Sequence, residues 1–186
     1  MKAFIAGLVI GIVILPLAGY WYFMSGRAPA AAGDKPLPFE KTLANGALHA
    51  HIEREMPKSV PIQANEEAFL AGARIYDESC GICHGFPAAE QGAIAKGMFP
   101  KPPHLFHGKG VTDDEPGETY WKVANGIRLT GMPAFKNSLN TTQMWQVSLL
   151  LANADKISDA VKQELKLSAA APLPISQPNQ AAPKKR

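Results

Sequence analysis

Cys80-Gly81-Ile82-Cys83-His84 is the most informative stretch of this sequence, because it holds both cysteines of the chain and a histidine directly after the second. Cysteines three positions apart lie on one face of a helical turn. From there each thiol can add to a vinyl group on the same edge of a haem, while the adjacent imidazole binds the iron. The spacing is that of a c-type haem attachment site. The sequence therefore predicts covalently bound haem (heme c), one per chain, held by thioethers from Cys80 and Cys83 and by an iron bond from His84.

Other uses of two cysteines account for this stretch less well. A structural zinc site needs four protein ligands, usually with a second Cys/His pair at tight spacing, and the sequence has no such pair. A thioredoxin-like redox pair belongs in a βαβ surround, whereas the flanks of this motif indicate helix and loop. A disulfide between Cys80 and Cys83 would leave His84 unexplained. Haem attachment uses all three side chains.

The 186-residue chain divides into four regions by composition. Residues 1–24 are predicted to form a transmembrane anchor or an uncleaved signal. Residues 25–64 have a linker composition, with a possible short helix over residues 43–56. Residues 65–167 carry the haem motif and the clearest helical signals. Residues 168–186 are mostly Ala, Pro, Gln and Ser, a composition that predicts disorder.

The N-terminal region is long enough to cross a membrane. Residues 3–24 carry no charge and end in the aromatic cluster Tyr20-Trp21-Tyr22-Phe23. As a helix, 22 residues span about 33 Å, against about 30 Å for a hydrocarbon core. The alternative is a cleaved signal peptide, processed near Ala28-Pro29-Ala30. Because the apolar run exceeds the usual core of about 7–15 residues in a signal peptide, we favour a retained anchor.

The charge distribution argues against nucleic acid as a partner. The chain has a net charge of +3, but residues 65–156 hold eight basic and ten acidic residues, a net charge of −2. This region has no basic patch that would steer it to a polyanion. An acidic group lies at Asp113, Asp114, Glu115 and Glu118. It could face a basic partner, but we favour a solvated helix start that complements the helix dipole.

Helical signals follow one another with no sustained alternation of period two, which predicts an all-α fold. Asn65 can cap a helix that runs into Cys80, and Pro116 can begin another that stops at Gly126. Asn140 or Thr141 can cap a helix carrying Trp145 and Leu149. A last short helix over residues 158–167 is expected to lie outside the core.

An electron-transfer haem needs a second axial ligand, and four candidates lie downstream: Met98, His104, His107 and Met132. Met132 has the most favourable context, because it lies in the loop Gly131-Met132-Pro133-Ala134-Phe135, where proline restricts the backbone. Met98 is the main rival and otherwise a core filler beside Phe99. A solvent-facing loop position is the more common role for the two histidines. His49 and His51, two positions apart on a helix, do not share a face and are poor joint ligands.

In this order and spacing the motifs resemble those of the class I c-type cytochromes. The matching stretches are the Cys80–His84 motif, Val123-Ala124-Asn125-Gly126-Ile127-Arg128, the Met132 loop and Trp145, under half of the chain. The resemblance implies three or four helices around one haem, with the first and last helices crossing. It implies His84 and Met132 as axial iron ligands and the carbonyl of Pro103 as acceptor for the His84 imidazole. Arg128 is a further candidate, as a contact of the haem propionates.

The function expected from these features is that of a membrane-tethered monohaem cytochrome c that carries single electrons. Its partners would be redox proteins or membrane oxidoreductase complexes, with no small-molecule substrate and no enzymatic activity of its own. Since c-type haem is attached outside the cytoplasm, the resemblance implies a bacterial inner-membrane protein with its haem domain in the periplasm. The alternatives are a fixed subunit of a larger membrane oxidoreductase and a haem-based sensor or peroxidase-like protein.

Overall fold

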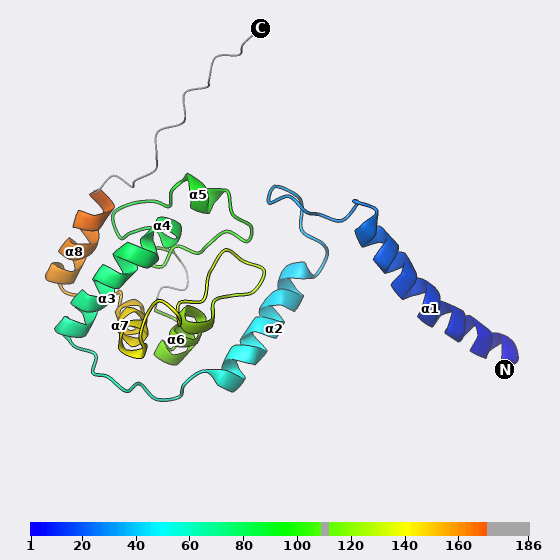
Figure 1. Ribbon diagram of the computed structural model, residues 1–186, viewed down its shortest axis with the longest axis horizontal. Coiled ribbons are helices and arrows are strands. Elements are labelled where there is room, and N and C mark those ends of the chain that lie inside the picture. The colour runs from blue at the N-terminus through cyan, green and yellow to red at the C-terminus, as the bar shows by residue number, and fades with distance from the viewer. Residues whose placement is uncertain (109–111, 171–186) are drawn as a thin grey trace, which may run out of the picture.

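A computed structural model describes residues 1–108 and 112–170, and these ranges form eight helices. Figure 1 shows their arrangement. In chain order they are α1 Lys2–Met24, α2 Glu40–Glu55, α3 Glu66–Ser79, α4 Gly81–His84, α5 Ala93–Lys96, α6 Pro116–Asn125, α7 Thr141–Ala152 and α8 Asp159–Ala170. The β pairing among the described residues is an isolated bridge between Phe86 and Ala89. The all-α prediction is confirmed. The disorder predicted for residues 168–186 is wrong for residues 168–170, which belong to α8, and otherwise falls on residues 171–186, outside the described ranges.

Local signals set the ends of the main helices. The Asn65 side chain accepts a hydrogen bond from the Ala68 amide at 2.9 Å and caps α3. Asn140 and Gln143 form a reciprocal capping box at the start of α7, with hydrogen bonds of 3.0 and 2.9 Å. Pro116 opens α6, and Gly126 ends it with a φ of 66°, which favours glycine.

The core forms where α3 crosses α7. Gly72 of α3 lies directly on the α7 backbone, since a Cβ at this position would be 2.5 Å from the Gln146 carbonyl oxygen. Glycine therefore sets how closely the two helices approach. Around this crossing Tyr76, Val147 and Leu150 are fully buried.

The last helix belongs to this core, so the expectation that it would lie outside was wrong. Ile157, Val161 and Leu165 recur every four residues and form one apolar stripe, and all three are buried. The stripe packs against α3. The helix also continues past residue 167, to Ala170.

Helix α2 packs on α6 and is more than a part of the linker (Figure 1). Ile52 and Met56 are buried, with 2% and 8% of their surface exposed. The Trp121 indole N–H donates to the Glu55 carboxylate at 3.3 Å, and the His51 ring meets the Trp121 ring edge-on. The segment between α1 and α2 is thereby reduced to residues 25–39.

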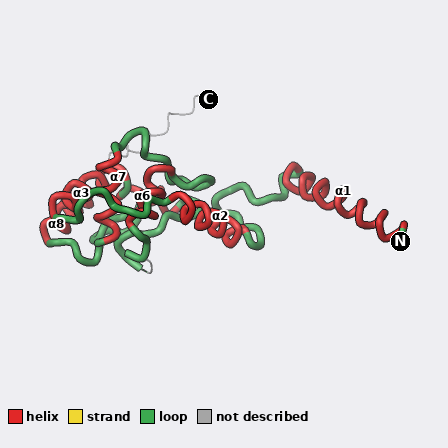
Figure 2. Tube along the Cα trace, turned by 90° about the horizontal axis from the view of Figure 1, so that it is seen from below, coloured by secondary structure: helices red, strands yellow, loops and turns green. Residues whose placement is uncertain are grey.

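Helix α1 extends away from the other helices in both views (Figures 1 and 2). By length and composition it can cross a membrane, with a mean hydropathy of 2.3 over its most apolar window. Most of its large apolar side chains, from Phe4 to Met24, are exposed. Such a surface suits lipid better than water.

Candidate haem site

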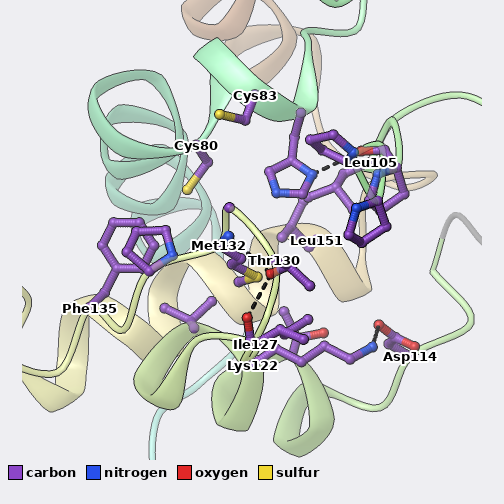
Figure 3. A pocket seen from close by; sticks show the side chains of 18 of the residues that line it. Cys80, Cys83, Leu105, Asp114, Lys122, Ile127, Thr130, Met132, Phe135 and Leu151 are labelled. Atoms are coloured by element: carbon purple, nitrogen blue, oxygen red, sulfur yellow. Dashed lines mark hydrogen bonds and ion pairs between the residues drawn. The ribbon is translucent and has the colours of Figure 1, made fainter. Parts of the chain in front are cut away.

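A cavity of about 380 Å³ lies between the Cys80–His84 turn and the Met132 loop (Figure 3). Its volume is within the range of about 300–1,000 Å³ that is common for ligand and cofactor sites. Cys80, Cys83, His84 and Met132 all contribute to its lining, which is mainly apolar. These residues fit covalently bound haem: two thiols at one end, an imidazole and a thioether as iron ligands, and apolar walls.

The cysteines are placed by the way α3 passes into α4. Cys80 ends α3, and the amides of Cys83 and His84 both donate to its carbonyl, at 3.1 and 2.9 Å. The two thiols are therefore held on a single helical turn. A Cβ at Gly81 would collide with the Phe86 ring, so this position of the turn requires glycine. The Tyr76 hydroxyl donates to the Gly85 carbonyl at 2.7 Å and ties the end of the motif to α3.

The imidazole of His84 is oriented by the proline-rich loop after α5. Its Nδ1–H donates to the Pro103 carbonyl at 2.8 Å, which leaves Nε2 without its proton and available to bind iron. Burial lowers the pKa of His84; the Pro103 hydrogen bond acts in the opposite direction, and His104 adds to the lowering. The neutral ring that a metal requires is thus favoured.

Gln91 supports the same turn and was not singled out from the sequence. Its buried side-chain amide donates to the carbonyls of Cys83 at 2.9 Å and Pro102 at 2.8 Å. It therefore joins the cysteine turn to the loop that carries Pro103. A buried glutamine between two loops has no local sequence signature, so only the fold reveals this role.

The free cysteines do not form part of a metal-ion cluster. Burial, and secondly the neighbouring Cys83, raise the pKa of the Cys80 thiol to about 12. Without haem, the thiol is therefore protonated at neutral pH. Within residues 1–108 and 112–170, no group of three or more His, Cys, Asp or Glu side chains is arranged to hold a metal ion.

Met132 lies in a loop braced by its own backbone. The Met132 amide donates to Thr130 Oγ1 at 3.1 Å, and its carbonyl accepts from the Ile127 amide at 3.2 Å. Met98 lines the same cavity, with its terminal methyl against Gly131, where a side chain would collide with it. Both methionines thus reach the cavity, and the choice of Met132 as iron ligand stays a prediction.

The remaining histidines are divided between loop contacts, helix packing and the cavity. His104 Nε2 faces the Ala89 carbonyl at 3.2 Å, and its Nδ1 accepts from the Phe106 amide. His107 donates to the Pro87 carbonyl at 2.7 Å. His51 Nε2 lies 2.9 Å from the Glu55 carboxylate, and its ring meets that of Trp121 edge-on. His49, in contrast, lines the cavity.

Arg128 is exposed and is not among the described residues that line the cavity, so its contact with haem propionates stays a prediction.

Part of the acidic group, Asp114, lines the cavity. Lys122 Nζ lies 2.6 Å from the Asp114 carboxylate and 2.9 Å from that of Glu118. Burial alone would lower the pKa of Lys122, but the two carboxylates outweigh it and raise this pKa. The acidic group is therefore partly an ion cluster at the cavity, not only a solvated helix start.

The crossed helices and the cavity with two cysteines, a histidine and a methionine define an all-α haem protein of the electron-transfer class. Residues 67–149 match the family described as cytochrome c oxidase, cbb3-type, subunit III. This match supports the class I c-type cytochrome fold that the sequence predicted for this segment. The family implies covalently bound haem c.

One solved structure with a similar chain is the Kuenenia stuttgartiensis reducing HAO-like protein complex Kustc0457/Kustc0458. The two chains are 27% identical, the match covers 53% of this chain and 51% of that one, and the TM-score is 0.43. This chain thus spans about half the length of the similar chain. The comparison with curated proteins gave no match.

Proposed function

We propose that this protein is a membrane-tethered monohaem cytochrome c that passes single electrons between redox partners in the periplasm. The observation that carries the proposal is the convergence of Cys80, Cys83, His84 and Met132 on one apolar cavity. Haem c bound there supplies an iron that alternates between the ferrous and ferric states. No step requires a proton donor, a nucleophile or a substrate pocket.

Each residue of the site has a separate task in this proposal. Cys80 and Cys83 would hold the haem covalently, each by adding its S–H group across one vinyl group, with one C–S bond formed and the hydrogen placed on the other vinyl carbon. His84 binds the iron through Nε2, with its ring held by Pro103. Met132 supplies a thioether, which favours the softer ferrous iron and raises the potential relative to two nitrogen ligands. Arg128 is assigned to the haem carboxylates.

The tether and the location form part of the same proposal. Helix α1 is long and apolar enough to span the membrane, and c-type haem is attached outside the cytoplasm. We place α1 in the bacterial inner membrane and the haem domain on its periplasmic side. The 15 residues between α1 and α2 then keep the domain close to membrane-bound partners.

A second candidate is a fixed electron-transfer subunit of a larger membrane oxidoreductase. It is supported by the matched family, whose description names an oxidase subunit. The two candidates differ in whether the protein leaves its complex. Solubilisation in mild detergent followed by size-exclusion chromatography distinguishes them: a shuttle elutes alone, and a subunit elutes with its partners.

The experiment that tests the haem function is a visible spectrum and a redox titration of the full-length, haem-loaded protein, with intact mass of the polypeptide. We expect a low-spin c-type spectrum, a methionine–iron charge-transfer band, a single one-electron transition and the mass of one attached haem. A high-spin spectrum that changes with carbon monoxide would instead indicate an open iron site and a sensor or peroxidase-like protein. A mass without haem in a correctly matured sample would refute the site.

A further inference from the structure

Helix α2 contributes to the cavity although it precedes the family segment, which begins at residue 67. Asn45, Leu48 and His49 line the same cavity as Cys80 and Met132. Positions 45, 48 and 49 are separated by three and four residues, so they share a face of the helix. The cavity therefore has a wall that the class I segment does not supply.

This wall is held in place by contacts at the other end of the helix. Ile52, four residues after Leu48 and three after His49, continues the same face and is buried. Glu55 accepts from the Trp121 indole, and Gly117 lies against the Pro57 carbonyl so closely that no side chain would fit. The C-terminal part of α2 is thus docked on α6, while its N-terminal part overhangs the cavity.

The side chains on this face of α2 become more exposed toward the cavity. Ile52 is buried and Leu48 is half-buried, whereas Asn45 and His49 are exposed. Other parts of the protein therefore cover this face at Ile52 but not where Asn45 and His49 line the cavity. The same cavity is lined by the two cysteines and His84, so the proposed haem is the group that would occupy it. This step rests on the proposed function.

The structure of haem indicates which end of the cavity would receive its carboxylates. Its two carboxylates project from the side of the porphyrin opposite the thioether bonds. Figure 3 shows Cys80 and Cys83 at one end and Lys122 with Asp114 at the opposite end. Lys122 lies on α6, the helix on which α2 is docked.

The haem carboxylates need hydrogen-bond donors at that end, because a carboxylate removed from water without partners is costly. Lys122 is already held by Asp114 and Glu118, so its charge is offset within the protein. The described lining residues include the side-chain donors Ser79, Lys101, Thr112, Thr119 and Thr130, and α2 adds an amide from Asn45 and an imidazole from His49.

We propose that α2 is a part of the haem site, with Leu48 covering the porphyrin edge and His49 donating a hydrogen bond to a haem carboxylate. The hydrogen bond disperses negative charge that would otherwise stabilise ferric iron, and Leu48 excludes water from the same edge. Both effects raise the reduction potential. The segment that links the domain to its anchor thereby also tunes the haem.

The test uses two pairs of variants in the full-length haem-loaded protein. His49→Leu removes the proposed donor, and His51→Leu removes an imidazole that faces Trp121 instead of the cavity. Leu48→Ser opens the proposed cover, and Leu43→Ser changes an exposed residue of the same helix outside the cavity lining. The readouts are the midpoint potential, the methionine–iron band and the propionate bending band in resonance Raman spectra.

We expect His49→Leu and Leu48→Ser to lower the potential while the methionine–iron band is retained, and His49→Leu also to shift the propionate band. Both control variants should match the parent. A c-type parent whose cavity-facing variants are indistinguishable from it would overturn this inference alone. A methionine–iron band that appears only in His49→Leu would place the imidazole on iron and also overturn it. A parent without a c-type spectrum would refute the proposed function, and this inference would fall with it.

Discussion

At the scale of single residues, the two methionines of the cavity give the sharpest test of the site. Met132→Ala should remove the thioether and open the iron to carbon monoxide or imidazole. We expect the potential to fall by at least about 120 mV, a hundredfold loss of preference for ferrous iron at about 59 mV per tenfold. Redox titration and ligand-binding spectra measure both effects.

Met98→Ala is the matched control, because this side chain reaches the same cavity and contacts Gly131 of the methionine loop. It should leave the methionine–iron band in place and change the potential much less. If the band disappears in Met98→Ala and persists in Met132→Ala, the iron ligand is Met98.

Lys122 gives a pH-dependent prediction. Its side chain is 20% exposed and pairs with two carboxylates that raise its pKa above the ordinary lysine value of 10.5. A raised pKa means that the folded state binds the proton more tightly, so this contribution is complete below pH 10.5 and disappears as the pH rises through the folded value. Lys122→Met should cost about 1–3 kcal/mol at pH 7, between exposed and fully buried pairs.

Urea unfolding at pH 7 and at pH 11 measures this contribution. The difference between the parent and Lys122→Met should shrink at the higher pH. Lys156→Met is the control, because Lys156 is largely exposed and lies 3.9 Å from Asp155. A Lys122→Met variant as stable as the Lys156→Met variant at pH 7 would show that the ion cluster does not stabilise the fold.

At the scale of elements, the crossing of α3 and α7 depends on Gly72. Gly72→Ala places a Cβ 2.5 Å from the Gln146 carbonyl oxygen and forces the two backbones apart. Overpacking typically costs about 1–3 kcal/mol, which exceeds the gain of about 0.5–1 kcal/mol from replacing glycine in a helix. We therefore expect a net loss of about 1–2 kcal/mol in the free energy of unfolding.

Gly46→Ala makes the same chemical change in α2, where nothing lies within 4 Å of the added Cβ. There only the helix preference acts, and the variant should be slightly more stable than the parent. Urea unfolding of the haem-loaded protein compares the two. Equal stability changes at both positions would mean that α3 and α7 do not cross closely at Gly72.

The helix ends and the attachment motif were predictable from the sequence because their causes are local. Asn65 and Asn140 cap the helices that they precede, and the Cys80–His84 turn needs only its own five residues. The place of α2 was not predictable, because it depends on a contact between Glu55 and Trp121, 66 positions apart. Leu48, Ile52 and Met56 recur every four residues and mark a face that packs, but this spacing does not show which helix the face packs against.

The same distinction explains the polar contacts of the site. Gln91 joins two loops through backbone carbonyls, and neither carbonyl is marked by its residue type. Glu118 is four positions before Lys122 on α6, a pairing that helix geometry alone allows, whereas only the fold brings Asp114, eight positions away, to Lys122 at the cavity. The side chains expected to bind the haem were therefore easier to predict from the sequence than the side chains that hold the surrounding loops in place.

At the scale of the whole molecule, the docking of α2 limits how far the haem domain can move from the membrane. Residues 25–39 span about 20 Å as a flexible coil and about 50 Å when fully extended. A linker of about forty residues would have allowed a wider range. The short tether favours partners that expose their redox centres close to the same membrane.

The anchor itself is the last prediction. If α1 is retained, the protein should stay in membranes washed with alkaline carbonate, and its mature chain should include residues 1–30. A variant in which a cleavable signal peptide replaces residues 1–24 should be released into the soluble periplasmic fraction with its haem spectrum unchanged, because α1 lies apart from the haem domain (Figure 1). Mass spectrometry of the N-terminus and fractionation measure these outcomes. A parent chain that begins after Ala30 would show that residues 1–24 act as a cleaved signal, and membrane binding would then require a partner.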